Sequence, residues 1–168
     1  ADDLMSIDCG GSPSPFNSIV RNDGDYNLMI LHEKLYVESF NGTGFYHAKG
    51  STILNSGSWY YLSVVWNGSS HELYINGNNE TISLSGFNNL SGITSDLFIG
   101  RSSLYCQGFE GDISHLEIWN TSLTQQEIQN YMNCPPTGSE LGLVGYWNFE
   151  EGSGAVALDQ TSNGNNGI

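Results

Sequence analysis

The chain has 168 residues, of which 18 are Asp or Glu and only 4 are Lys or Arg, so its formal net charge is −14. So few cations cannot neutralise a phosphate backbone, which argues strongly against nucleic-acid binding and against an anionic membrane surface. No stretch of the sequence reaches the roughly 18–20 apolar residues that a membrane span needs. Divalent cations and neutral, hydroxyl-rich molecules remain as ligand classes.

Short apolar and β-branched runs, separated by Gly, Asn and Ser, predict a series of strands. Turn signals recur roughly every 8–12 residues, which is typical of an all-β sandwich. The run 59–66 is apolar on both faces and is expected to be a central strand, with its tryptophans in the core. The expected strands are Tyr26–Leu31, 34–38, 45–48, 59–66, 72–75, 81–84, 97–100, 112–119 and 143–149.

Two local signals are specific. Asn76-Gly77 follows a short apolar run and predicts a type I′ hairpin turn, because both residues tolerate a positive φ. Thr124 and Glu127 have the spacing of a capping box, in which each side chain satisfies a backbone amide of the other residue. We therefore expect one short helix near residues 125–132, ended by Pro135-Pro136.

Two longer stretches carry a family resemblance. Residues 59–77 read WYYLSVVWNG followed by ELYING, and residues 109–128 read FEGDISHLEIWN followed by LTQQEI. Both resemble, in order and spacing, the laminin G-like domains of the concanavalin A-like lectin/glucanase superfamily, and the second resembles pentraxins in outline. The resemblance implies an all-β, two-sheet antiparallel jelly-roll sandwich with one short helix.

A third stretch resembles the opening strand of such a domain, although it comes last in this chain. It begins GLVGYWNFEEGSG at residue 142. We expect a sandwich over residues 1–134 without the usual first strands, a Pro/Gly linker at 135–141, and a strand with a Gly/Asn-rich tail at 142–168. The last segment either opens a following repeat or folds back as an extra strand on the domain before it.

Aromatic rings in loops, next to side chains that bond to hydroxyls, are candidates for sugar binding, because ring faces stack on the CH groups of pyranoses. Phe45 and Asn89 are among the wider set of loop residues considered. The predicted ligand-binding residues are Phe40, Asn41, Tyr46, Phe87, Asn88 and Tyr105.

An oxygen-rich cluster near the end of the chain is the candidate metal site. It contains Asp159, Ser162, Asn163 and Asn165, in a turn-rich stretch. Carboxylates and Asn side chains are ligands that calcium prefers, so we expect calcium there as a structural ion. The same residues also suit a polar loop without metal, since Asn and Gly tolerate tight turns. The acidic stretch 22–25 is a weaker candidate for calcium and reads more simply as a turn.

The three cysteines allow at most one internal disulfide. Cys106 precedes an expected strand and Cys134 follows the expected helix. If the strand and the helix are neighbours, these two cysteines can form a bridge. Cys9 would then be free or paired outside this chain.

These observations predict an extracellular or cell-surface module that recognises glycans or matrix components, supported by calcium and without catalytic activity. A first alternative is a structural repeat of a surface protein or filament, which binds copies of itself through strand complementation. A more distant alternative is a degenerate β-glucanase-like hydrolase that uses Glu110 and Asp112. The chain contains no nucleophile elbow, zinc-protease motif, P-loop or dinucleotide fingerprint.

Overall fold

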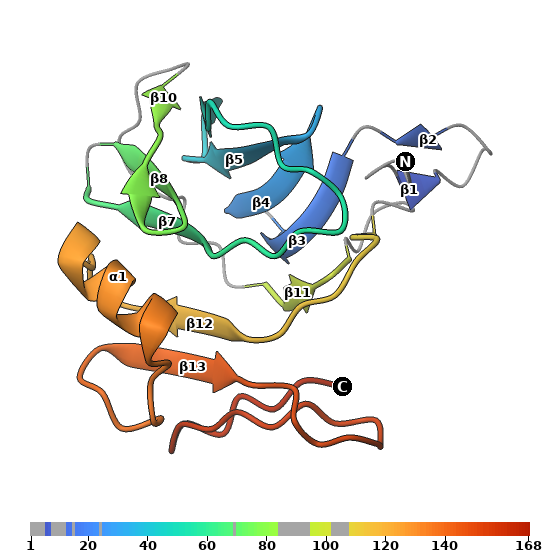
Figure 1. Ribbon diagram of the computed structural model, residues 1–168, viewed down its shortest axis with the longest axis vertical. Helices are drawn as coiled ribbons and strands as arrows, with labels where there is room; N and C mark the ends of the chain where they lie inside the picture. The colour runs from blue at the N-terminus through green and yellow to red at the C-terminus, as the bar shows by residue number, and fades with distance from the viewer. Residues whose placement is uncertain are drawn as a thin grey trace. The chain divides into compact units, whose positions relative to one another are not determined.

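The computed structural model describes residues 6–7, 13–14, 16–23, 25–68, 70–83, 95–101 and 108–168. The chain divides into two compact units, residues 1–111 and residues 112–168. The described elements are antiparallel strands and one short helix, which confirms the predicted all-β class (Figure 1). The helix that the structure describes is too short to cross a membrane.

The described residues of the first unit form three antiparallel sheets. The largest has the strand order β10-β6-β5-β4-β3-β11, a second has the order β7-β8-β9, and β1 pairs with β2. The strands are β1 (Ser6–Ile7), β2 (Pro13–Ser14), β3 (Phe16–Asn22), β4 (Tyr26–Leu31), β5 (Lys34–Phe40), β6 (Phe45–Lys49), β7 (Leu62–Trp66), β8 (His71–Ile75), β9 (Asn78–Asn79), β10 (Ile82–Ser83) and β11 (Leu97–Ile99).

The hydrophobic core of this unit lies between the six-stranded and the three-stranded sheet. Along β5, buried and half-buried residues alternate, as the two-residue period of a strand requires. Leu35 and Val37 from β5 pack with Leu73 and Ile75 from β8. Two sheets therefore face each other across a shared core, as expected for a sandwich.

The expectation for the run 59–66 was wrong in two respects. The strand β7 begins only at Leu62, and β8 is its one partner among the described strands, so it is an edge strand. The side chain of Trp59 is 66% exposed instead of buried. The apolar composition of a run does not distinguish a central strand from an edge strand that follows an exposed segment.

Two-residue turns close two of the hairpins. Asn76 and Gly77 have φ values of 50° and 72°, which confirms the predicted type I′ turn between β8 and β9. Between β4 and β5, His32 and Glu33 also have positive φ, 50° and 61°. His32 tolerates this left-handed conformation better than most residues, but Glu33 does not favour it, so the second turn is more strained than the first.

The second unit contains β12 (Leu116–Trp119), α1 (Gln125–Asn133) and β13 (Leu143–Trp147). The helix matches the prediction, and both hydrogen bonds of the capping box between Thr124 and Glu127 are present. The segment 135–141, which we expected to be a linker between domains, lies inside this unit and connects α1 to β13.

The strand β13 pairs antiparallel with β12, so the last segment folds back within the chain. Its other edge is also used, because Gln160 N donates to Tyr146 O and Trp147 forms a β-bridge with Asp159. The Trp147 indole also lies over Gly145, where a Cβ atom would come within 2.4 Å of the ring. Glycine at position 145 is therefore required by this packing.

Candidate functional site

A row of polar side chains crosses the outer face of the six-stranded sheet, meaning the face turned away from β7–β9. Arg21 in β3 lies opposite Asn27 in β4, Asn27 lies opposite Glu38 in β5, and Glu38 lies opposite His47 in β6. Side chains alternate along a strand, and Val37, the neighbour of Glu38, packs into the core. The four polar residues therefore share the outer face.

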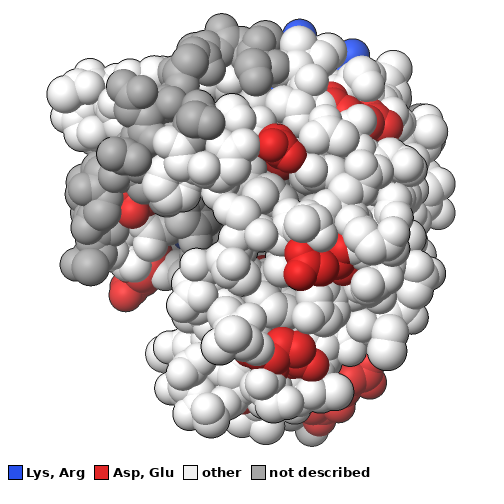
Figure 2. Space-filling model, turned by 90° about the vertical axis from the view of Figure 1, so that its left-hand side faces the viewer, with Lys and Arg blue, Asp and Glu red and all other residues white. Residues whose placement is uncertain are grey.

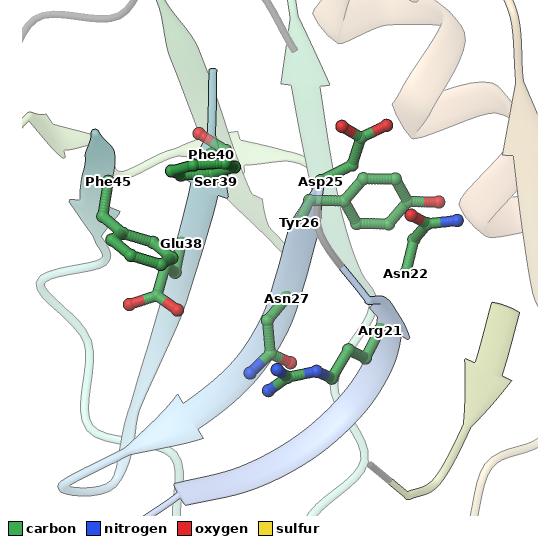
Figure 3. Close-up of a pocket in the computed structure, with 9 residues that line it drawn as sticks. All are labelled: Arg21, Asn22, Asp25, Tyr26, Asn27, Glu38, Ser39, Phe40 and Phe45. Carbon is green, nitrogen blue, oxygen red and sulfur yellow. The ribbon is translucent and has the colours of Figure 1, made fainter. Parts of the chain in front are cut away.

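A pocket of about 210 Å³ opens on this face at one end of β4 and β5 (Figure 3). Two phenylalanines on facing strands form an aromatic pair beside it: Phe40 and Phe45 have ring centroids 5.0 Å apart. Phe45 is 60% exposed, so its ring is available to a ligand. The lining residues are Arg21, Asn22, Asp25, Tyr26, Asn27, Glu38, Ser39, Phe40 and Phe45.

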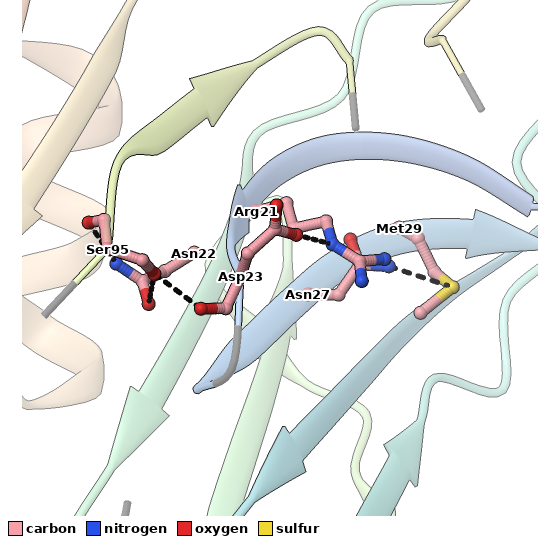
Figure 4. Close-up of polar contacts among 6 residues, drawn as sticks. All are labelled: Arg21, Asn22, Asp23, Asn27, Met29 and Ser95. Carbon is pink, nitrogen blue, oxygen red and sulfur yellow. Dashed lines mark hydrogen bonds and ion pairs between the residues drawn. The ribbon is translucent and has the colours of Figure 1, made fainter. Parts of the chain in front are cut away.

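Ser39, which is 1% exposed, and Asn27 are buried polar residues of the pocket, and each has a buried oxygen without a hydrogen-bond partner among the described residues. Asn27 has only 4% of its surface exposed. Its Nδ2 lies 3.8 Å from the sulfur of Met29, a weak acceptor (Figure 4). Its Oδ1 is buried and receives no hydrogen bond from any residue that the structure describes. A buried acceptor without a donor costs roughly 1–3 kcal/mol, so this position calls for a functional explanation.

Arg21 and Glu38, two charged residues that line the pocket, each lie beside an ionisable neighbour. Arg21 Nε donates to the Asp23 carboxylate, which orients the guanidinium (Figure 4). The segment that carries Asp23 lies against Ser95, whose Oγ is 2.9 Å from Asn22 Oδ1 and also within hydrogen-bond distance of the Asp23 carbonyl, and which can donate its one proton to either oxygen. Glu38 Oε2 lies 3.7 Å from Nδ1 of His47, whose ring adds a positive charge only when it is protonated.

Elsewhere on the surface, carboxylates are numerous and cations are few. Figure 2 shows Asp and Glu side chains spread over the face in view, with Lys or Arg only at its upper edge. Near the pocket, burial and then the Glu38 carboxylate raise the pKa of Tyr36.

Of the six residues predicted to bind a ligand, Phe40 lines the pocket. Asn41 instead organises the turn between β5 and β6: its Oδ1 accepts from Thr43 and from Gly44 N, and its Nδ2 donates to the Tyr46 hydroxyl. Tyr46 follows Phe45 in β6 and so points to the opposite face of the sheet. The other three, Phe87, Asn88 and Tyr105, lie outside the described residues.

Hydrogen bonds connect the residues of the predicted metal cluster to β13 and to one another. Asp159 is buried; its Oδ1 accepts from Tyr146 N and Thr161 N, and its Oδ2 accepts from Thr161 Oγ1 and Asn165 N. Burial raises the pKa of Asp159, but these hydrogen bonds outweigh it and hold the pKa below its usual value. Asn163 and Asn165 both donate to the Val144 carbonyl, and Ser162 is exposed.

This arrangement does not fit a calcium site. A carboxylate has about four lone-pair positions, and donors of the chain itself fill all four on Asp159. Across the described residues, no three His, Cys, Asp or Glu side chains gather as metal ligands. The structure thus gives Asp159 the role of a hydrogen-bond centre that fixes the tail to β13, and calcium binding stays a prediction.

The remaining candidates that the structure describes are on the surface. Cys134 caps the C-terminal end of α1 and is exposed, without a disulfide to any described residue. Cys106 and Cys9 lie outside the described residues, so the predicted 106–134 bridge stays a prediction. Glu110 and Asp112, the pair named for hydrolysis, are both exposed.

A comparison with models of protein families agrees with this fold. A family model described as the concanavalin A-like lectin/glucanases superfamily matches residues 7–129. The chain belongs to this superfamily. The match confirms the resemblance found in the stretches 59–77 and 109–128, and it ends within α1, before β13.

Among solved structures, the chain is similar to an S-layer domain-containing protein from Clostridium thermocellum. The two are 21% identical with a TM-score of 0.39, and the alignment covers 79% of this chain. It spans 65% of the length of that structure. A search of curated proteins found no match.

Signals for most of the pocket were absent from the sequence. Arg21, Asn27 and Glu38 are single polar residues within three different strands, and nothing in their local sequence links them. Only the strand register brings them together. Phe45 was considered among the exposed aromatic residues but not placed in the predicted site, and its pairing with Phe40 across β5 and β6 brings it to the pocket.

Proposed function

We propose that this member of the concanavalin A-like superfamily is a non-catalytic recognition module, active at the cell surface or outside the cell, that binds glycans through the pocket on its outer face. The observation that carries the proposal is Asn27, a buried amide whose oxygen has no donor among the described residues, next to the aromatic pair Phe40 and Phe45. Sugars supply hydroxyl donors for such an oxygen and CH faces for such rings.

The size of the pocket supports a small ligand unit. Its volume of about 210 Å³ is below the roughly 300–1,000 Å³ of pockets that enclose drug-sized ligands. One sugar ring, such as a chain end or a branch, suits this space better than a long segment. Affinity for a single ring is weak, so adhesion would depend on several modules acting together.

The experiment is a glycan array followed by calorimetric titration of the best binders. Phe45→Ala removes the exposed ring at the pocket, and we expect it to lower affinity at least 10-fold. The matched control is Trp59→Ala, which removes an aromatic residue of similar exposure outside the pocket. Trp59→Ala is expected to leave binding unchanged. Equal effects of the two variants, or no binding of any glycan, would overturn the proposal.

The alternative is a structural repeat with strand complementation, for which β13 is not available although the edge strand β7 is. A strand offered to a neighbouring module needs a free edge. The strand β13 uses one edge for β12 and the other for the bridge between Trp147 and Asp159. Self-association into fibres, without a glycan signal, would favour this alternative.

The absence of catalysis is part of the proposal. In a glycosidase, two carboxylates flank the scissile bond in a shaped site. Glu110 and Asp112 are exposed and do not line the pocket. Hydrolysis of a β-glucan that is abolished by Glu110→Gln would replace this proposal with the hydrolase alternative.

A further inference from the structure

We propose that Asn163 is a site of spontaneous covalent modification, at which the chain converts an asparagine to aspartate and isoaspartate and thereby loosens the segment 159–167 from β13. The site lies in the second unit, so it is independent of the pocket on the six-stranded sheet. Three observations carry the proposal: the Asn-Gly sequence, the few hydrogen bonds that hold this amide, and the contacts that follow it in the chain.

The reaction needs only an asparagine side chain, the next backbone amide and water. The backbone nitrogen attacks Cγ, the Cγ–Nδ2 bond breaks, and ammonia leaves with the proton of the attacking nitrogen. Water then opens the resulting five-membered imide at one of its two carbonyls. One product is aspartate, and the other is isoaspartate, whose backbone continues through the side chain. A following glycine favours the attack, because it has no Cβ to obstruct ring closure.

The sequence contains this pair five times, with Gly after Asn41, Asn67, Asn76, Asn163 and Asn166. In an unfolded chain the five pairs are nearly equivalent. In the folded chain, Cγ must swing onto the nitrogen of the next residue, so hydrogen bonds that hold either group slow the reaction. The tertiary structure therefore decides which pair reacts.

Three of the pairs are held by hydrogen bonds to the side-chain amide. Asn41 Oδ1 accepts from two backbone amides of its turn, and its Nδ2 donates to the Tyr46 hydroxyl. Asn67 is engaged on both amide atoms within its own turn. Asn76 Oδ1 accepts from Tyr61 N at 2.9 Å, and the glycine that follows it is buried. These side chains are fixed away from ring closure.

The pair at Asn166 is held at both reacting groups. Asn166 Oδ1 accepts from Asp159 N at 3.0 Å. The nitrogen that would attack, Gly167 N, donates to Ala157 O at 2.8 Å. Two hydrogen bonds must therefore break before this pair can react.

Asn163 is the least constrained of the five. Asn163 and Gly164 are both exposed, and the space where a Gly164 Cβ would lie is open. Among the described residues, one hydrogen bond holds the amide, from Nδ2 to Val144 O at 2.9 Å, and no described residue accepts from Gly164 N. Releasing the amide leaves no orphan carbonyl, because Asn165 Nδ2 also donates to Val144 O.

Conversion at this position disturbs the contacts that come next in the chain. Asn165 N donates to Asp159 Oδ2 at 2.9 Å, and Asn165 O accepts from the Trp147 indole at 3.0 Å. Isoaspartate lengthens the backbone by one methylene two residues before Asn165, which shifts both groups relative to β13. The new carboxylate also replaces the amide that donated to Val144 O, so an acceptor faces an acceptor. The segment 159–167 is thus loosened.

The experiment follows all five asparagines in the same unsubstituted chain. The protein is incubated at mildly alkaline pH, which favours deprotonation of the attacking nitrogen. Each site is then quantified in chymotryptic peptides by tandem mass spectrometry, as a gain of about 1 Da. We expect Asn163 to convert at least about 10-fold faster than each of the other four. In concentrated urea the five rates should converge to within about 3-fold, because only local sequence then acts.

Hydrogen exchange before and after incubation measures the loosening. We expect exchange in the segment 159–167 to rise at least about 5-fold in the converted chain. Asn163→Gln keeps an amide but requires a larger ring, which forms far more slowly, so this variant should show no rise. Asn166→Gln, in the same segment, is the matched control and should leave the rise in place.

The outcomes separate the two parts of the proposal. If Asn163 converts no faster than the other four in the folded chain, the assignment of the site is overturned. If it converts first but exchange stays unchanged, or rises equally in Asn163→Gln, the loosening is overturned. Neither result depends on glycan binding, so the proposed function is tested separately.

Discussion

Glu38 lies directly opposite Asn27 in the antiparallel register of β4 and β5, so a half-exposed carboxylate is the cross-strand neighbour of a buried amide. A sheet selected for stability alone would pair such an amide with a donor, because a buried acceptor without one is costly. The Asn27 oxygen has no such donor among the described residues. This pair of residues is therefore where stability and function can be separated experimentally.

Asn27→Leu tests that separation. Leucine has a similar size and removes the buried acceptor, so we expect the free energy of unfolding to stay unchanged or to rise by about 1 kcal/mol. Glycan binding should be lost. The measurements are urea denaturation and calorimetric titration.

Asn17→Leu is the matched control in the neighbouring strand, because Asn17 is equally buried but has an interaction partner. This variant should destabilise the protein by roughly 1–3 kcal/mol, since its partner is left unpaired. If Asn27→Leu costs as much as Asn17→Leu, Asn27 has a structural role instead.

His71 makes stability depend on pH. It lies on the core side of β8 with Leu73, and burial lowers its pKa to about 4, from an ordinary value of 6.5. The unfolded chain therefore binds a proton at a pH where the folded chain does not, so stability is complete above about pH 6.5 and falls as the pH approaches 4. At about 1.4 kcal/mol for each pKa unit, the loss is roughly 3 kcal/mol.

Denaturant titrations between pH 7 and pH 4.5 measure this loss. His71→Phe should flatten the dependence over this range relative to the unsubstituted chain. His32→Gln replaces an exposed histidine and should leave the dependence in place. A His71→Phe variant with an unchanged slope would show that other groups cause it.

Asp159 should stabilise the second unit without metal. Asp159→Ala leaves backbone donors of Tyr146, Thr161 and Asn165 without an acceptor, and we expect a loss of about 3 kcal/mol. Folding lowers the pKa of Asp159, so its contribution to the free energy of unfolding is fully present at pH values above the ordinary carboxyl pKa. This contribution is lost as the pH falls through the lower pKa of the folded chain. Asp112→Ala, at an exposed position, is the control.

Thermal stability also tests whether the Asp159 region binds calcium. Thermal unfolding with millimolar calcium and with a chelator should give the same Tm, because the Asp159 oxygens are already used. A bound ion would stabilise the folded chain in proportion to its saturation. A rise in Tm with calcium that disappears in Asp159→Asn would establish the calcium site that the sequence predicted.

The strained turn between β4 and β5 predicts a stabilising double substitution. His32→Asn together with Glu33→Gly installs the residues that a type I′ turn prefers. We expect the free energy of unfolding to rise by about 1 kcal/mol. The reverse control is Gly77→Ala, which should destabilise the hairpin because Gly77 has a φ of 72°. An unchanged or lower stability of the double variant would show that the β4–β5 turn is not strained.

Features with local physical causes could be predicted from the sequence. The capping box at Thr124 and Glu127 and the turn at Asn76-Gly77 depend on residues a few positions apart, and both formed as expected. The strand β4 was predicted with its observed bounds. By contrast, β3 was not predicted, because Phe16–Asn22 is largely polar, and two of its polar residues, Asn17 and Ser18, are buried only through their neighbours.

The candidate site was predictable only in part. The composition and the aromatic residues in predicted loops led to the prediction of a hydroxyl-rich ligand and of Phe40 as a binding residue. The tertiary structure alone decided that Phe45 faces the pocket while Tyr46 does not, and that Arg21, Asn27 and Glu38 form one row. The physical reason is register: each strand can be read from its own residues, but shifting a pairing by one position moves every side chain to the opposite face.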